Sequence, residues 1–355
     1  MKRKNGRRCL CFALLAVLLF LFASSALRLN NVKDTMHIQG FFKEPKDTID
    51  VIAIGASEIY TSLNSPLAWE EYGFTSYSVS FAGAPGSLYK AMLKEALNRQ
   101  NPEVVVIEIN GFLNGDKYLE KDAKKHTWFD NVPWSSVKWE SMQELISKDK
   151  MAEYLVDFIK YHDNWRHPLK CGKNFYWKVR LALKGISDVK CFGTTTLYRG
   201  DVAFKDFTPK YTEKTEAVLV DLLEYCKEQG LDQVLFLRTP HCINNKTLEV
   251  YDRIEELVTS YGYDFLNLES SFEEVGLDPA VDFYNKDHMN TYGMEKMTEY
   301  LGEWITTHYE LPQTHSDKLT QYWDQCAEKM HVLLEKSKVD LDNGKKVDYY
   351  EISGI

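Results

Sequence analysis

The sequence predicts an α/β fold built on a doubly wound parallel sheet of about five strands. Short, continuous apolar runs alternate with amphipathic helical segments along much of the chain. Such alternation is typical of parallel strands joined by helical crossovers. The 355 residues are 44% hydrophobic, with no low-complexity run. This is enough apolar material for one large domain or two ordinary ones, and it excludes a disordered chain.

The expected strands are continuous apolar runs of the kind that a sheet buries on both faces. They are Thr48–Gly55, Tyr77–Phe81, Glu103–Ile109, Gln233–Leu237 and Tyr263–Leu268. Helices are expected at Ser87–Arg99, Glu216–Gln229 and Arg253–Tyr261, around Met294–Ile305 and around Leu319–Leu334. This order favours the doubly wound, flavodoxin-like class.

The N-terminus indicates a membrane segment. No charged residue occurs from Leu10 to Leu27, which is close to the shortest length that crosses a bilayer. Basic residues precede this run, so the positive-inside rule predicts a cytoplasmic N-terminus and an extracytoplasmic body after Arg28. Ser24–Ala26 resembles a cleavage site, which would make the run a removable signal peptide. The leucine-rich core fits an uncleaved signal anchor, which we favour.

Four parts are expected along the chain. Residues 1–28 form a basic flank and signal anchor, and 29–47 form a tether. Residues 48–312 form the α/β domain, and 313–355 form a C-terminal helix and tail. Residues 115–210 interrupt the alternation as a helical insertion that holds five of the eight tryptophans, namely Trp128, Trp134, Trp139, Trp165 and Trp177. The insertion either covers a site or, as we favour for most of these rings, packs onto the sheet.

Charge and cysteine content limit the function classes. The formal charge is −9, and the body beyond the basic N-terminal flank is more acidic still, so no nucleic-acid partner is expected. Two of the seven cysteines, Cys9 and Cys11, precede or enter the apolar run. In an extracytoplasmic body Cys171 and Cys191 are a candidate disulfide. The others, Cys226, Cys242 and Cys326, lie in apolar stretches where buried thiols are expected.

A candidate nucleophile follows the first strand. In a parallel sheet, loops at the carboxyl ends of the strands form the ligand crevice. There the chain reads Gly55-Ala56-Ser57-Glu58. A serine at a helix N-terminus is placed where backbone N–H groups favour developing negative charge. The tetrapeptide alone is equally that of an ordinary helix cap.

A candidate base follows the last strand. The polar loop Asp282–Asn290 contains His288 and precedes a helix. A doubly wound fold returns this part of the chain to the first strand. A serine nucleophile needs a base within hydrogen-bond reach and a third group that orients the base. Ser57 and His288 can supply the first two.

These motifs resemble the SGNH/GDSL hydrolase superfamily. The likeness is carried by IGASEIY, AGAPG and a late N-x-x-H-x-N-x-x-G, and it spans about residues 48–308. Within the superfamily the sequence is most similar to membrane-anchored envelope members related to the teichoic-acid D-alanylation protein. The resemblance implies that Ser57 is the nucleophile and His288 the base. It also implies an oxyanion hole from the N–H groups of Ser57 and of Gly83 or Gly86, with Asn110 as a further candidate donor.

The third triad position departs from the family pattern. Asn285 stands where the family has aspartate. If Asn285 faces His288, the ring is expected to hold the wrong tautomer, and in a serine protease the exchange of aspartate for asparagine costs about 10⁴ in turnover. Asp287 is adjacent to His288, and neighbouring side chains in an extended loop point apart. Asp282 is a more distant alternative.

Three other histidines are candidate site residues. His241 follows Thr239-Pro240 after the expected strand Gln233–Leu237, at the edge of the sheet that forms the crevice, so it is expected to line the pocket. His162 and His167 lie in a segment that either contacts substrate or is a structural cluster. No group has metal-ligand spacing and no phosphate-binding loop occurs, so no metal or cofactor is expected.

The function expected is that of an extracytoplasmic, membrane-tethered serine esterase or O-acyltransferase. Its substrates would be acyl esters of cell-envelope glycans or teichoic-acid polymers, and the resemblance implies a membrane O-acyltransferase partner. Two alternatives remain open. One is a catalytically weak or silent member that binds envelope polymer or serves as the scaffold of an acylation complex. The other is a lipid-cleaving esterase with the Trp-rich insertion as an apolar lid.

Overall fold

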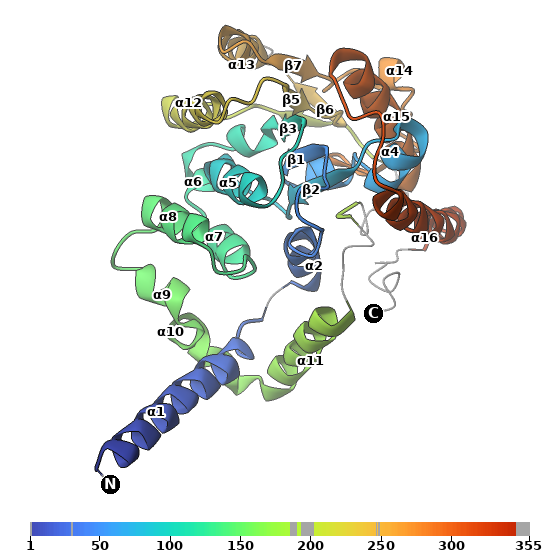
Figure 1. Cartoon of the computed structure of the whole chain (residues 1–355). Helices are drawn as coiled ribbons and strands as arrows, with labels where there is room; N and C mark the ends of the chain where they lie inside the picture. The colour runs from blue at the N-terminus through green and yellow to red at the C-terminus, as the bar shows by residue number, and fades with distance from the viewer. Residues whose placement is uncertain are drawn as a thin grey trace.

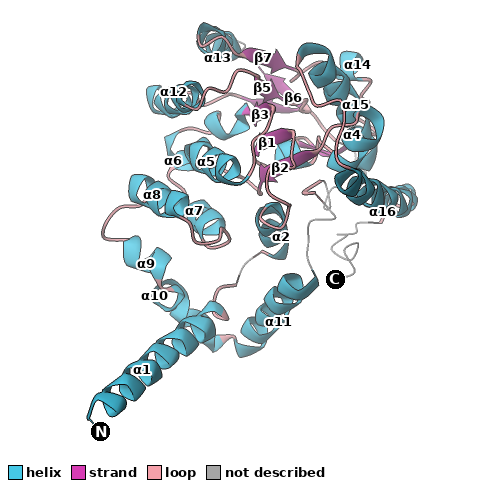
Figure 2. Cartoon of the chain, viewed as in Figure 1, coloured by secondary structure: helices cyan, strands magenta, loops and turns pink. Residues whose placement is uncertain are grey.

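A five-stranded parallel sheet forms the centre of the molecule (Figures 1 and 2). The computed structural model describes residues 2–29, 31–184, 190–192, 202–245, 247 and 249–345. The strands are β1 (Val51–Gly55), β2 (Ser76–Ser80), β3 (Val104–Glu108), β5 (Val234–Arg238) and β7 (Asp264–Asn267). Their order is β2-β1-β3-β5-β7, and every neighbouring pair is parallel. The predicted parallel sheet of five strands is confirmed.

Helices cover both faces of the sheet (Figure 1). Alternate side chains of a strand point to opposite faces, and in β1 Ile52 and Ile54 join one apolar cluster while Val51 and Ala53 join another. The first cluster includes side chains of α5 (Tyr89–Arg99), α12 (Glu213–Glu228) and α13 (Glu249–Ser260). The second includes side chains of α4 (Ser65–Tyr72) and α15 (Thr291–His308). Both faces are therefore buried, which explains the continuous apolar runs.

Shorter elements complete the body. Two small sheets pair β4 (Lys205–Phe207) with β6 (Ile243–Asn245), and β8 (Phe283–Asn285) with β9 (His288–Met289). The short helices near the sheet are α3 (Ser57–Tyr60), η1 (Gly86–Leu88), η2 (Ile109–Phe112) and α14 (Phe272–Val275). The long C-terminal helix is α16 (Asp317–Asp342), which packs beside α4 and buries Trp323 completely. Residues 346–355 of the expected tail lie outside the described residues.

The described part of the insertion is largely helical. It contains α6 (Asp116–Leu119), α7 (Asp122–Phe129), α8 (Ser136–Leu145), α9 (Met151–Leu155), α10 (Asp157–Tyr161), η3 (His162–Arg166) and α11 (Pro168–Lys184). Its tryptophans have different environments. Trp128 is buried and stacks on Phe81 of the loop after β2, whereas Trp134 and Trp165 are exposed. Packing on the sheet thus accounts for only some of the rings.

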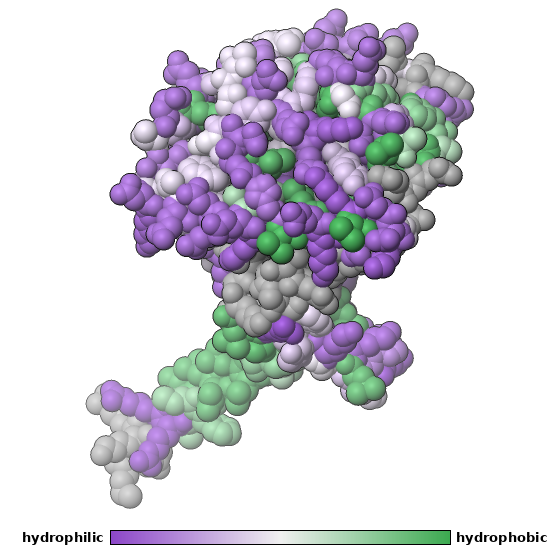
Figure 3. Space-filling model, turned by 90° about the vertical axis from the view of Figure 1, so that its right-hand side faces the viewer, coloured by the Kyte–Doolittle hydropathy of each residue, from purple (hydrophilic) through white to green (hydrophobic). Residues whose placement is uncertain are grey.

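The chain begins with a long apolar helix, α1 (Lys2–Ser25), that projects from the body. Its segment Arg7–Ser25 is long and apolar enough to cross a membrane, with a mean hydropathy of 2.2. Only 6% of this segment is buried, and Figure 3 shows it as a hydrophobic rod beneath a mostly hydrophilic face. The expected tether differs from the structure, because it contains the buried helix α2 (Val32–Phe41). This helix packs on β2, where Tyr77 donates a hydrogen bond to the carbonyl of His37 at 2.9 Å.

The predicted disulfide between Cys171 and Cys191 is wrong. Both thiols are free and buried. Cys171 lies on α11, where its Sγ donates to the carbonyl of Asn164 at 3.2 Å. Cys191 lies against β2, with its Sγ 3.5 Å from Ser80 Oγ. The two cysteines belong to different parts of the fold. The thiols expected to be buried at Cys226, Cys242 and Cys326 are buried.

Candidate active site

Ser57 lies at the carboxyl end of β1, where the chain turns into the single-turn helix α3. Gly55 allows this tight turn. A Cβ at Gly55 would lie 3.0 Å from both Glu108 Cβ on β3 and Ile59 Cγ2 on α3. A larger residue would therefore push the turn away from the sheet. The Ser57 side chain therefore lies at the carboxyl ends of the strands and is largely buried.

His288 reaches Ser57 from the other end of the sequence. It begins β9, the second strand of a hairpin that precedes α15. Asn290 anchors this hairpin, because its side chain accepts from Tyr292 N at 2.9 Å and donates to the carbonyl of Val281 at 2.6 Å. As a result, His288 Nε2 lies 2.7 Å from Ser57 Oγ. This is the distance of a nucleophile from its general base.

Asn285 determines the tautomer of His288. Its Oδ1 lies 2.9 Å from His288 Nδ1, 2.9 Å from the N–H of Asp287 and 3.0 Å from the N–H of His288. Backbone N–H groups can only donate, so the atom they contact is the amide oxygen, not the nitrogen. His288 Nδ1 must then carry a proton, which leaves Nε2 free to accept the proton of Ser57. This is the tautomer that a general base requires, so the wrong tautomer expected from the sequence is corrected by the direction of the Asn285 amide.

His288 is electrostatically suited to accept a proton. Burial lowers its pKa from the usual value, whereas the nearby carboxylates of Glu58 and Asp287 raise it. Lys33 and Lys286 lower it further, and the net shift is downward. The ring is therefore neutral at pH 7, which is the form that acts as a base.

The carboxylates of Asp287 and Asp282, which were the alternatives to Asn285, bind groups other than the His288 ring. Asp287 pairs with the ammonium of Lys286 and influences His288 only through its charge. Asp282 accepts from Asp278 N at 2.7 Å and from Lys296 Nζ at 2.6 Å, so it holds the loop before the hairpin. Of the three candidates for the third position, Asn285 is the one that contacts the ring.

The loop after β2 carries the two glycines expected at an oxyanion hole. Gly83 has a left-handed backbone, with φ of +63°, that L side chains rarely adopt. The adjacent Ala82 is held on both sides, because its N–H donates to Asp34 Oδ1 at 3.0 Å and its carbonyl accepts from Lys124. Gly86 has a packing role. A Cβ there would lie 2.6 Å from the ring of Phe112.

Asn110 is joined to the site indirectly. Its Nδ2 donates to Glu58 Oε1, and its Oδ1 accepts from Arg238 Nη1 at 3.1 Å. Glu58 Oε2 in turn lies 3.3 Å from Ser57 Oγ. Asn110 was expected as an oxyanion donor, but one of its amide hydrogens binds Glu58.

A network of buried charged residues beside Asn110 was not predicted from the sequence. Arg238, at the end of β5, is 1% exposed and donates to Glu269 Oε1 at 3.1 Å. Its Nη1 lies 3.8 Å from Glu108 Oε1 at the end of β3. Burial, and then the charge of Glu58, raise the pKa of Glu108 well above its usual range. The available signal was a charged residue at the carboxyl end of each of these apolar runs.

The other histidines have different environments. His241 is buried near His288, with its Nδ1 2.6 Å from the carbonyl of Thr239 and a pKa lowered mainly by burial. Its Nε2 has no hydrogen-bond partner among the described residues. His162 and His167 are exposed on η3 and the turn that follows it, so they form a surface segment of the insertion.

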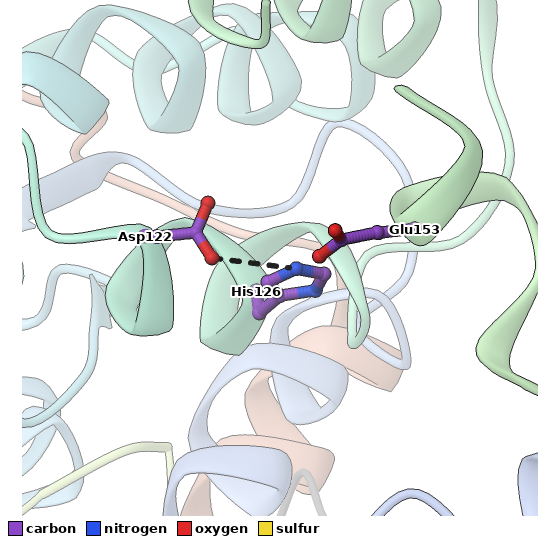
Figure 4. Close-up of side chains that lie close together, drawn as sticks. All are labelled: Asp122, His126 and Glu153. Carbon is purple, nitrogen blue, oxygen red and sulfur yellow. Dashed lines mark ion pairs between the residues drawn. The ribbon is translucent and has the colours of Figure 1, made fainter. Parts of the chain in front are cut away.

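One group of side chains has the composition of a metal site (Figure 4). Its members are Asp122, His126 and Glu153, whose ligand atoms lie within 4.8 Å of one another. However, Lys160 Nζ lies 2.9 Å from Asp122 Oδ2 and 3.0 Å from Glu153 Oε2. Burial opposes ionisation of Asp122, but hydrogen bonds from Lys160 and Tyr154 lower its pKa to about 2. The ammonium of Lys160 thus pairs with both carboxylates, and that of Lys150 lies 3.4 Å from Asp122 Oδ1, so these cations occupy the place that a metal ion would take.

Comparison with known protein families finds no family that matches the chain, and comparison with curated proteins finds no match either. Function is therefore inferred from the geometry around Ser57, His288 and Asn285.

Proposed function

We propose that this protein is an extracytoplasmic, membrane-tethered serine esterase or O-acyltransferase. The observation that carries the proposal is the continuous relay from Ser57 Oγ to His288 Nε2 at 2.7 Å and from His288 Nδ1 to Asn285 Oδ1 at 2.9 Å. The order of the motifs, which resembles that of the SGNH/GDSL hydrolase superfamily, supports it. The strand order and the two helical layers likewise support the doubly wound, flavodoxin-like arrangement.

The relay can perform acyl transfer in two steps. Ser57 Oγ attacks the carbonyl carbon of an ester while its proton passes to His288 Nε2. The leaving alcohol departs with that proton, and the acyl group remains on Ser57 as an ester. Water or a sugar hydroxyl then attacks the acyl-enzyme and gives its proton to His288. Transfer of this proton back to Ser57 Oγ regenerates the enzyme and releases an acid or a new ester.

The substrates that we propose are acyl esters of cell-envelope polysaccharide or teichoic-acid polymers. The apolar segment Arg7–Ser25 supports this choice, because an anchored domain remains next to the envelope. The basic residues before this segment support an extracytoplasmic body. A membrane O-acyltransferase that delivers the acyl group is proposed as a partner from the family resemblance.

A second candidate function is polymer binding or scaffolding without turnover. The neutral side chain of Asn285 favours it, because an amide orients His288 but adds no negative charge to stabilise the imidazolium. Retention of envelope polymer without release of acid from acetylated xylan or acetylated peptidoglycan would distinguish this candidate from the enzyme.

Reaction with a serine-directed fluorophosphonate tests the enzyme proposal. The full chain in detergent is treated with the probe, and its intact mass is measured for wild type, Ser57→Ala and Ser62→Ala. Ser62 is a matched control, because it is a buried serine close to Ser57 whose hydroxyl donates to the carbonyl of Glu58 at 2.7 Å. We expect one adduct on wild type and on Ser62→Ala, and none on Ser57→Ala. A folded wild-type chain that forms no adduct would overturn the proposal.

A further inference from the structure

The segment from α10 to α11 exposes large apolar side chains that a water-facing surface normally lacks. Leu169 is 89% exposed, Leu183 81% and Trp165 64%. Phe158 and Tyr176 are also exposed. We call residues 157–184 the juxtamembrane surface. Its composition differs from the mostly hydrophilic face of the body in Figure 3.

On α11 the exposed apolar side chains share one face. Leu169, Tyr176 and Leu183 are spaced seven residues apart, which places them along one line of an α-helix. The opposite face contains Asn174, which is buried and donates to the carbonyl of Arg28. The helix therefore exposes large apolar side chains next to the exposed Lys170 and Lys173, while the polar Asn174 is buried.

This surface begins where α1 ends. The rings of Phe20 and Phe158 are 5.5 Å apart, and those of Phe22 and Phe175 are 5.2 Å apart. Lys178 Nζ donates to the carbonyl of Ser25 at 2.7 Å, which caps the last turn of α1. Figure 1 shows α10 and the start of α11 beside this end of α1. The exposed apolar side chains thus continue the apolar surface of the candidate membrane span.

Cations accompany the apolar side chains. Lys170 and Lys173 line a cavity of about 480 Å³ between α11 and the start of α2, together with Leu29 and Trp177. Arg28 forms an ion pair with Asp157 at 2.6 Å, so that carboxylate is neutralised. Cations near a membrane surface are attracted to anionic lipid headgroups. Aromatic rings such as Trp165 also favour the headgroup level of a bilayer.

We propose that the juxtamembrane surface lies in the headgroup region of the leaflet from which α1 emerges, and that it binds anionic phospholipid headgroups through Lys170 and Lys173. The inference rests on α1 spanning the membrane as proposed above, and it does not depend on the acyl-transfer activity. The surface gives the body a second attachment to the bilayer and restricts how the body turns about its anchor.

Quenching by brominated lipids tests this placement. The full chain is reconstituted into phosphatidylcholine vesicles that carry bromine at a shallow acyl position, and tryptophan fluorescence is measured for wild type, Trp165→Phe and Trp134→Phe. Trp134 is a matched control, because it is 61% exposed but lies on the loop before α8. We expect Trp165→Phe to lose a large part of the lipid-dependent quenching, with Trp177 of the same surface supplying the rest, and Trp134→Phe to retain all of it.

Anionic lipid tests the role of the lysines. Adding phosphatidylglycerol to the vesicles should increase the quenching of Trp165 in wild type, and the double variant Lys170→Gln/Lys173→Gln should lose this increase. An equal response of wild type and double variant would overturn the headgroup assignment.

Vesicle flotation separates the possible failures. A chain that does not float with the vesicles would overturn both the membrane anchor and this inference. A chain that floats, reacts with fluorophosphonate at Ser57 and shows no quenching specific to Trp165 would overturn this inference alone. The exposed apolar side chains would then indicate a protein partner.

Discussion

At the residue scale, the proposed relay depends on which atom of the Asn285 side chain faces His288, the amide oxygen or the amide nitrogen. Two backbone N–H groups point at the side chain of Asn285, so its oxygen faces them and His288 Nδ1. A neutral residue thereby supplies the tautomer that aspartate normally supplies. The charge that aspartate would add is absent from this position. Part of it comes from Glu58 and Asp287, which raise the pKa of His288 against the effect of burial.

Substitution of Asn285 separates orientation from charge. Asn285→Ala removes the acceptor that holds Nδ1, so we expect fluorophosphonate labelling of Ser57 to slow by about 10²–10⁴-fold, the usual contribution of a general base. Asn285→Asp keeps the acceptor and adds a charge, so labelling should be at least as fast as in wild type. Labelling rates measured by intact mass check both. Equal rates for wild type and Asn285→Ala would show that Asn285 has no role in the relay.

The labelling rate should depend on the protonation of His288. Its neutral form is reactive and burial lowers its pKa, so the rate should rise with pH and level off, with a midpoint below the usual value of 6.5. Asn285→Asp should move this midpoint upward, because a nearby carboxylate favours the imidazolium. Rates recorded from pH 4.5 to pH 8 check this. A wild-type midpoint above 6.5 would contradict it.

At the element scale, the turn from β1 to α3 requires the absence of a side chain at Gly55. Gly55→Ala places a Cβ 3.0 Å from Glu108 and Ile59, and we expect a loss of about 1–3 kcal/mol in the free energy of unfolding. Ser57 should shift with the turn, so labelling should slow as well. Chemical denaturation and labelling measure the two effects. Gly172→Ala is the control, since nothing lies within 4 Å of its added Cβ and labelling should not change.

A buried ion pair connects the insertion to the segment that follows α2. Lys190 Nζ lies 2.7 Å from Glu44 Oε2, and neither side chain is exposed. Lys190→Met removes the cation and should lower the free energy of unfolding by about 3–5 kcal/mol. The exposed pair of Lys46 and Asp47, 3.9 Å apart, provides the control. Lys46→Met should change the free energy by less than about 1 kcal/mol. Similar losses in both variants would contradict the role of the buried pair.

At the scale of the whole molecule, a cysteine placed before the candidate span reports the orientation in the membrane. Cys9 and Cys11 lie inside Arg7–Ser25, and the other five cysteines are buried. If the N-terminus is cytoplasmic, a membrane-impermeant maleimide should not label Asn5→Cys in intact cells and should label it in permeabilised cells. Wild type treated in the same way is the control for background labelling. Labelling of Asn5→Cys in intact cells would contradict the proposed orientation.

Much of the fold could be predicted because the same apolar residues specify local structure and burial. Each strand expected from a continuous apolar run is present, with ends shifted by a few residues. Segments without a clear apolar pattern were harder to predict. The expected tether contains the buried helix α2, whose contacts come from the sheet rather than from its own pattern. The expected disulfide failed because two cysteines close in sequence pack against different elements.

For the candidate site, the sequence by itself determined which residues are candidates for the proposed chemistry. Ser57 follows a buried strand, and His288 and Asn285 occur in one short polar loop. Only the tertiary structure decided how these groups meet. Ser57 and His288 are 231 residues apart in the chain, and their contact, like the network around Arg238, depends on strands β1, β3, β5 and β7 being neighbours. The N–H groups of Asp287 and His288 set the direction of the Asn285 amide once the hairpin has formed. Apolar patterning specifies that a strand is buried. Which charges become neighbours there depends on the order in which the strands pair.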